Sequence, residues 1–97
     1  MPSLRQIRYF IAAAEAQKIT SAASALNISQ SAVTVAIKEL EAELGTALFT
    51  RSASGIILTF EGVRFLSHAR NIEAAVADSV RAMRSETQVI QGRLRVV

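Results

Sequence analysis

Cysteine and tryptophan are absent from this 97-residue sequence, and histidine occurs once. Without cysteine the chain has no disulfide framework, no thiolate metal site and no cysteine nucleophile, and one histidine cannot supply a pair at metal-ligand spacing. These absences exclude most enzyme classes. We therefore expect a protein that is not an enzyme and that holds neither a cofactor nor a metal ion.

Long hydrophobic runs are also absent. The longest one, Tyr9 to Ala14, is far shorter than the roughly 18 residues that a membrane-spanning helix needs. The first residues lack the basic start, the apolar stretch and the small-residue cleavage site of a signal peptide. We expect no contact with a membrane and a location in the cytoplasm.

Charge of either sign is sparse, since charged residues make up 20% of the chain and the formal net charge is only +3. Hydrophobic residues make up 51%, which indicates a folded chain, and 97 residues suffice for one domain. So weak a positive charge barely favours a nucleic-acid partner. Any such function has to be argued from the pattern of residues along the chain.

Two helices are predicted before the turn at Asn27. Residues 4–16 follow the 3.6-residue period of a helix, with apolar side chains at Leu4, Ile7, Phe10, Ile11 and Ala14. Thr20 or Ser21 can cap a second, short helix. This helix ends at Asn27, a residue that tolerates the left-handed backbone of a sharp turn.

Ser29 caps a third predicted helix, which ends at Gly45 and buries Val33, Ile37, Leu40 and Leu44. Its opposite side is small and nearly free of acids in its first half: Ser31, Thr34, Val35, Lys38 and Ala42. Such a surface can enter the major groove of DNA, where bulky or acidic side chains would collide with bases or be repelled by phosphates. The first N–H groups of the helix, at Ser29, Gln30 and Ser31, can hold a phosphate oxygen.

Beyond Gly45 the pattern predicts a β-hairpin, with strands near 48–51 and 56–58 and a turn between them. Thr59 can cap a long helix over residues 60–91, because this stretch has no proline and a glycine only near its start. Its apolar stripe consists of Phe65, Ala69, Ile72, Val76, Val80 and Met83. So long a stripe needs a partner helix, and we expect a second copy of the chain. The alternative is that the stripe packs on its own domain.

Two short helices, a tight turn and a hairpin follow one another in the order of a winged helix-turn-helix. We therefore predict a mostly α fold, in which residues 1–59 form a winged helix-turn-helix domain with a small β-hairpin wing and residues 60–91 form a long linker and dimerisation helix. The helix-turn-helix spans about 19–38 and the wing about 48–58. Gly92 is expected to end the long helix, and residues 92–97 to begin a further domain as a strand.

Residues 4–62 resemble the DNA-binding domain of LysR-type transcriptional regulators. The matching stretches are Leu4 to Phe10, Thr20 to Ala23, Asn27 to Thr34, Leu40-Glu41, Glu43 to Gly45, Leu48-Phe49, Arg51 and Leu58-Thr59. Residues 60–91 resemble the linker helix of the family, and residues 92–97 the start of its effector-binding domain. The resemblance implies a dimer or tetramer that binds a pseudo-palindromic promoter site. It also implies a response to a small-molecule inducer through a C-terminal domain that lies beyond these 97 residues.

Direct hydrogen-bonded reading of bases is expected to be sparse. Val35 and Ala36 stand where the family often has a basic or polar pair, and Ser54 lies near a wing position that is frequently basic. The expected roles are thymine-methyl contact for Val35, base reading for Gln30 and Thr34, and phosphate contact for Lys38 and Arg51.

Simpler interpretations remain for several of these residues. The outward face of the third helix and Arg51 could be ordinary solvated surface. Glu39 and Glu43, four residues apart, could chelate a cation, although a solvated helix face is the more economical interpretation. His68 is expected at a surface or an interface. The main alternative function is a helical oligomerisation or protein-interaction module whose winged fold binds another protein.

Overall fold

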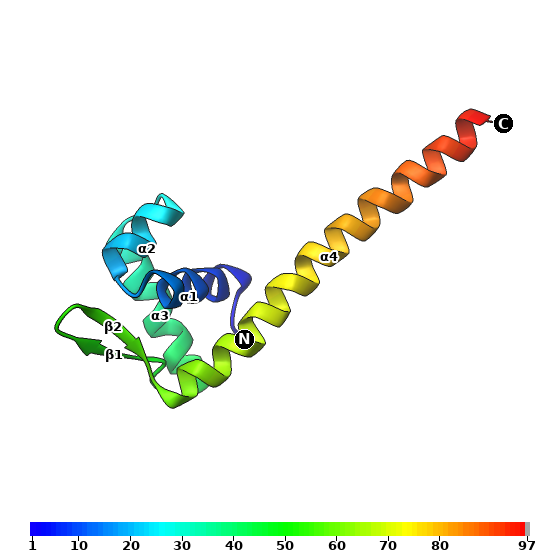
Figure 1. Ribbon diagram of the computed structural model, residues 1–97. Coiled ribbons are helices and arrows are strands. Elements are labelled where there is room, and N and C mark those ends of the chain that lie inside the picture. The colour runs from blue at the N-terminus through cyan, green and yellow to red at the C-terminus, as the bar shows by residue number, and fades with distance from the viewer. Residues whose placement is uncertain (97) are drawn as a thin grey trace.

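The computed structural model describes the backbone of residues 1–96 and the side chains of residues 1–85. Three short helices and a hairpin form a compact unit, from which one long helix projects (Figure 1). In chain order the elements are α1 (Leu4–Ala16), α2 (Ile19–Leu26), α3 (Gln30–Leu44), β1 (Phe49–Ser52), β2 (Gly55–Leu58) and α4 (Phe60–Val96). The two strands form one antiparallel hairpin. We call residues 1–59 the head.

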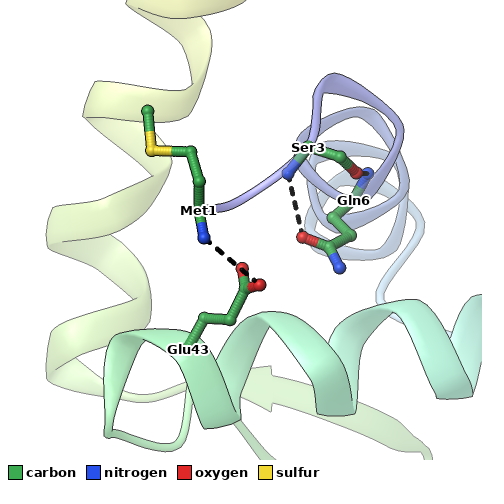
Figure 2. Close-up of polar contacts among 4 residues, drawn as sticks. All are labelled: Met1, Ser3, Gln6 and Glu43. Carbon is green, nitrogen blue, oxygen red and sulfur yellow. Dashed lines mark hydrogen bonds and ion pairs between the residues drawn. The ribbon is translucent and has the colours of Figure 1, made fainter.

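The start of α1 is determined by a capping box. The Ser3 hydroxyl accepts from the backbone N–H of Gln6 at 3.1 Å, and the Gln6 side chain accepts from the backbone N–H of Ser3 at 3.0 Å (Figure 2). Beside it, the amino group of Met1 lies 3.5 Å from the Glu43 carboxylate. Since Met1 is fully exposed, this ion pair adds little stability.

Most of the predicted helix limits are confirmed. Helix α1 spans the expected residues 4–16, and α2 ends at Asn27, which has the expected left-handed backbone. Ser29 caps α3 and Gly45 ends it with a positive φ of 72°. Thr59 accepts the backbone N–H of Gly62 at 2.9 Å, as expected of a cap for α4.

Two expected limits are wrong. Helix α2 begins at Ile19 with Lys18 as its cap residue, so Thr20 and Ser21 lie inside the helix. The chain has already turned at Gln17, whose φ of 62° is left-handed, and Ile19 can therefore enter the helix and pack on the core. At the other end, α4 continues through Gly92 to Val96 instead of ending there and giving way to a strand. Glycine weakens a helix by only about 1 kcal/mol, so Gly92 alone does not end α4.

The core is built around α1, which packs against α2, α3 and α4. Phe10 is fully buried, and its ring contacts those of Phe49 and Phe65, with ring centroids 5.3 Å apart in each pair. A second cluster joins α1, α2, α3 and β2, and it contains Ala13, Ala22, Ala23, Val33, Ile37 and Ile56. The small side chains of α2 let the helices approach closely. Leu4, expected on the inner face of α1, is instead exposed.

Within the part of the chain that the structure describes, no helix has the length and apolar character needed to span a membrane.

The Phe10 ring is predicted to be the main determinant of stability. Phe10→Ala would empty a fully buried site and lower the free energy of unfolding by about 3–5 kcal/mol. The matched control is Phe60→Ala, because Phe60 is 73% exposed and should cost less than about 1 kcal/mol. Urea denaturation followed by circular dichroism measures both. Equal losses for the two variants would show that Phe10 does not centre the core.

Candidate nucleic-acid interface

The outward side of α3 is the surface that the sequence predicts. Ser31, Lys38 and Ala42 are exposed, Thr34 is partly exposed, and the apolar Val35 is 55% exposed. Its neighbours Val33 and Ile37 are buried, so the helix separates its two faces sharply. Apart from Lys38, these outward residues have small side chains. The surface is therefore narrow enough to approach a nucleic-acid groove.

The start of α3 is exposed and well formed. Ser29 and Gln30 are exposed, and the Ser29 hydroxyl accepts the backbone N–H of Ala32 at 3.1 Å. The first N–H groups of any α-helix have no acceptor within the helix. This end of α3 can therefore donate to an anionic oxygen, with the positive end of the helix dipole behind it.

The hairpin lies beside α3 and brings Arg51 to the same side. A hollow of about 110 Å³ separates the two elements, and its lining includes Thr34 and Lys38 from α3 and Arg51 from β1. Lys38 and Arg51 are both exposed, and within residues 1–85 neither belongs to an ion pair. Two cations from separate elements therefore border one concave surface, which suits a phosphate backbone.

Three hydrogen bonds hold the hairpin and its two ends in this position. At its turn, the Ile56 N–H donates to the Gln17 carbonyl at 3.0 Å. At its far end, the Thr59 hydroxyl donates to the Ala47 carbonyl at 2.7 Å. At its start, the Glu41 carboxylate accepts from the backbone N–H of Leu48 at 2.7 Å. The hairpin is thus fastened to α3 and to the junction between α1 and α2.

Glu41 is not among the site residues predicted from the sequence, although its position in α3 carries a signal. Ile37, Leu40, Glu41 and Leu44 form an i, i+3, i+4, i+7 set, so the acid occupies a position on the apolar side of α3. An acidic residue at such a position needs a hydrogen-bond partner. The partner itself was not predictable, because it is a backbone group of the hairpin.

The apolar stripe of α4 is divided between two environments. Phe65 packs on Phe10, and Ala69 is fully buried in the same cluster. These two residues therefore contribute to the core of their own chain, as in the alternative interpretation, although Phe65 is only partly buried. Their contact with a second copy stays a prediction. Further along, Ile72, Val80 and Met83 are exposed and Val76 is partly exposed. For these four residues dimerisation stays a prediction.

The remaining candidates lie on the surface. Glu39 and His68 are exposed, and Glu43 faces the amino group of Met1. In the part of the chain with described side chains, no group of three acidic, histidine or cysteine residues is arranged to hold a metal ion.

Comparison with known proteins identifies close relatives. Residues 4–63 match the family model described as "Bacterial regulatory helix-turn-helix protein, lysR family". The chain is 40% identical over 94 residues to the HTH-type transcriptional regulator BsdA of Bacillus subtilis, covering 96% of this chain and 32% of that protein. It is 39% identical over 94 residues to the regulator TfdT of Cupriavidus pinatubonensis, covering 97% of this chain and 41% of that protein. The chain thus spans well under half the length of these relatives.

Solved structures also resemble the chain. The crystal structure of the CbnR_DBD–DNA complex superimposes with a TM-score of 0.83 at 41% identity, covering 88% of this chain and 98% of that chain. The BenM_DBD/benA site 1 DNA complex gives a TM-score of 0.80 at 35% identity, covering 84% of this chain and 95% of that chain.

Alanine substitutions at two glycines test the close approach of the hairpin turn to Gln17. A methyl group at Gly55 would collide with the carbonyl oxygen of Gln17, whereas one at Gly45 would meet nothing within 4 Å, and both residues have positive φ. Gly45→Ala should cost about 1 kcal/mol of stability from backbone strain alone. Gly55→Ala should cost about 1–3 kcal/mol more, because the hairpin must shift and because a φ of 153° strains alanine more than the 72° of Gly45. Urea denaturation compares the two, and equal costs would contradict the close approach.

Proposed function

The chain belongs to the LysR family of bacterial regulatory helix-turn-helix proteins, and we propose that it binds double-stranded DNA with α3 in the major groove and the hairpin on the adjoining backbone. As the DNA-binding domain of a transcriptional regulator, it is not an enzyme. The observation that carries the binding mode is the hollow in which Thr34, Lys38 and Arg51 meet.

Each part of the interface has a separate role. Gln30 and Thr34 read base edges by hydrogen bonding, and Val35 contacts thymine methyl groups. Ser29 and Ser31 hold a phosphate through the start of α3, and Lys38 and Arg51 contact phosphates on either side of the hollow. All of these side chains are exposed except that of Thr34, which is partly exposed, and this supports the assignment.

The protein acts as a dimer through the exposed part of α4. A single head carries little net positive charge, so useful affinity needs two heads on one DNA molecule. A symmetric pair of helices covers Ile72, Val76, Val80 and Met83 and sets the distance between the two α3 helices. The DNA site is accordingly pseudo-palindromic, with half-sites in successive major grooves.

In the complete regulator, a further domain makes DNA binding responsive to a small molecule. Residues 1–59 form the winged helix-turn-helix domain, the following helix links it to an effector-binding domain, and a small-molecule inducer acts through that domain. Pairing of effector domains makes a tetramer possible. The protein works in the cytoplasm, where bacterial DNA is accessible.

A protein-interaction module is the second candidate, and the exposed Val35 on a weakly charged surface favours it. Fluorescence anisotropy of labelled random and promoter duplexes over a series of salt concentrations separates the two functions. DNA binding that weakens steeply with salt supports the proposal. Absence of salt-sensitive binding to both duplexes would support the protein-interaction module instead.

The phosphate contacts are tested by Lys38→Ala and Arg51→Ala. Each should weaken binding to all sequences and reduce the slope of log K against log[salt] by about one counterion. Val35→Ala serves as the contrasting variant, because it should weaken binding to preferred sequences while leaving the salt slope unchanged. Anisotropy titrations with random and selected duplexes measure these effects. Relaxed sequence preference in Lys38→Ala or Arg51→Ala would contradict the assigned roles.

The dimer interface is tested by placing a charge on the exposed stripe of α4. Val80→Asp should shift the protein towards monomer, because an unpaired carboxylate would be buried between the two helices. Ala74→Asp is the control, since residue 74 is exposed and lies on the opposite side of α4. Sedimentation equilibrium reports the dissociation constants. The proposed interface is incorrect if both variants remain dimers or both become monomers.

A further inference from the structure

Glu41 differs from the other glutamates of α3 in its surroundings. Glu39 and Glu43 are exposed, whereas Glu41 is partly buried. Its Oε2 atom accepts from the backbone N–H of Leu48 at 2.7 Å and from that of Phe49 at 3.4 Å. Phe49 is the first residue of β1 and Leu48 directly precedes it, so Glu41 connects α3 to the start of the hairpin.

The two residues whose N–H groups donate to Glu41 also have side chains packed in the core. The Leu48 side chain is fully buried, and the Phe49 ring packs against Phe10. Partly buried N–H groups that lose a charged acceptor carry a desolvation cost, and only movement towards water relieves it. Loss of the Glu41 carboxylate would therefore allow the start of β1 to move away from α3.

Arg51 lies two residues after Phe49 on the same strand, and it lines the hollow together with Glu41 and Lys38. The position of Arg51 relative to Lys38 therefore depends on where the first residues of β1 lie relative to α3. The carboxylate thus lines the same hollow as the two cations that are proposed to contact phosphates, with Oε2 directed to the backbone N–H groups of Leu48 and Phe49.

We propose that Glu41 is a positioning residue for DNA binding, which sets the distance between the phosphate contacts of Lys38 and Arg51 by holding β1 against α3. This inference rests on the proposed function. Glu41 does not contact DNA in this arrangement; it acts through the strand that carries Arg51.

A double-mutant cycle tests the proposal with a labelled random-sequence duplex, since phosphate contacts do not depend on sequence. Arg51→Ala is compared in the wild-type background and in the Glu41→Ala background. If Glu41 acts by placing Arg51, Glu41→Ala alone reproduces most of the affinity loss of Arg51→Ala. The further loss from Arg51→Ala in that background, on a logarithmic scale, falls below about half of its wild-type value.

Two variants serve as controls. Glu39→Gln removes an exposed carboxylate from the same helix, so it should bind DNA at least as well as wild type and leave the Arg51→Ala loss unchanged. Glu41→Gln keeps an oxygen that can accept from the Leu48 N–H, so it should restore most of the affinity lost in Glu41→Ala. It also provides a second variant if Glu41→Ala does not fold.

Amide hydrogen exchange supplies a readout that does not involve DNA. In Glu41→Ala the Leu48 and Phe49 amides should exchange at least about tenfold faster. The Gln17 amide, which donates to Ala13 at 2.9 Å, should be unchanged if the rest of the head stays folded. Equal exchange at Leu48 and Phe49 in the variant and wild type would overturn the proposal.

The outcomes also distinguish this proposal from the proposed function. If wild-type protein binds DNA but Arg51→Ala costs the same in both backgrounds, the role of Glu41 is wrong and the DNA-binding function stands. If wild-type protein shows no salt-sensitive DNA binding, the proposed function is wrong and the positioning role falls with it.

Discussion

The contact between three phenylalanine rings is the constraint on which the rest of the structure depends. Phe10 comes from α1, Phe49 from β1 and Phe65 from α4, and Phe10 lies between the other two. Their burial brings the hairpin and the first turns of α4 to the same helix. Hydrogen bonds from hairpin N–H groups to the Gln17 carbonyl and the Glu41 carboxylate then select one orientation of the hairpin among those that the apolar contact would allow.

Placement compensates for sparse charge in the proposed DNA-binding surface. The net charge of +3 provides little general attraction to a polyanion. The fold instead places two exposed cations, Lys38 and Arg51, at one hollow. The outward face of α3 extends from this hollow to the N-terminus of the same helix. Specific binding in this arrangement depends on geometry, so residues that never contact DNA become important for it.

Features with local causes were predictable from the sequence. The limits of α1, the capping of α3 by Ser29 and its end at Gly45 follow from periodicity and capping chemistry, and the hairpin follows from its turn residues. The exposure of the predicted α3 residues also followed from periodicity. Features set by tertiary contact were not predictable: α2 begins early because Gln17 turns the chain, and Phe65 packs against Phe10 of its own chain.

The packing of Phe65 and Ala69 has a mechanical consequence. Since the first turns of α4 are part of the same core as α1, the joint between the long helix and the unit that it carries has no hinge. Rotation of the first turns of α4 would therefore rotate the whole head with them. In the proposed dimer, regulation would then change the orientation of two intact heads relative to each other, without a change in the fold of either head.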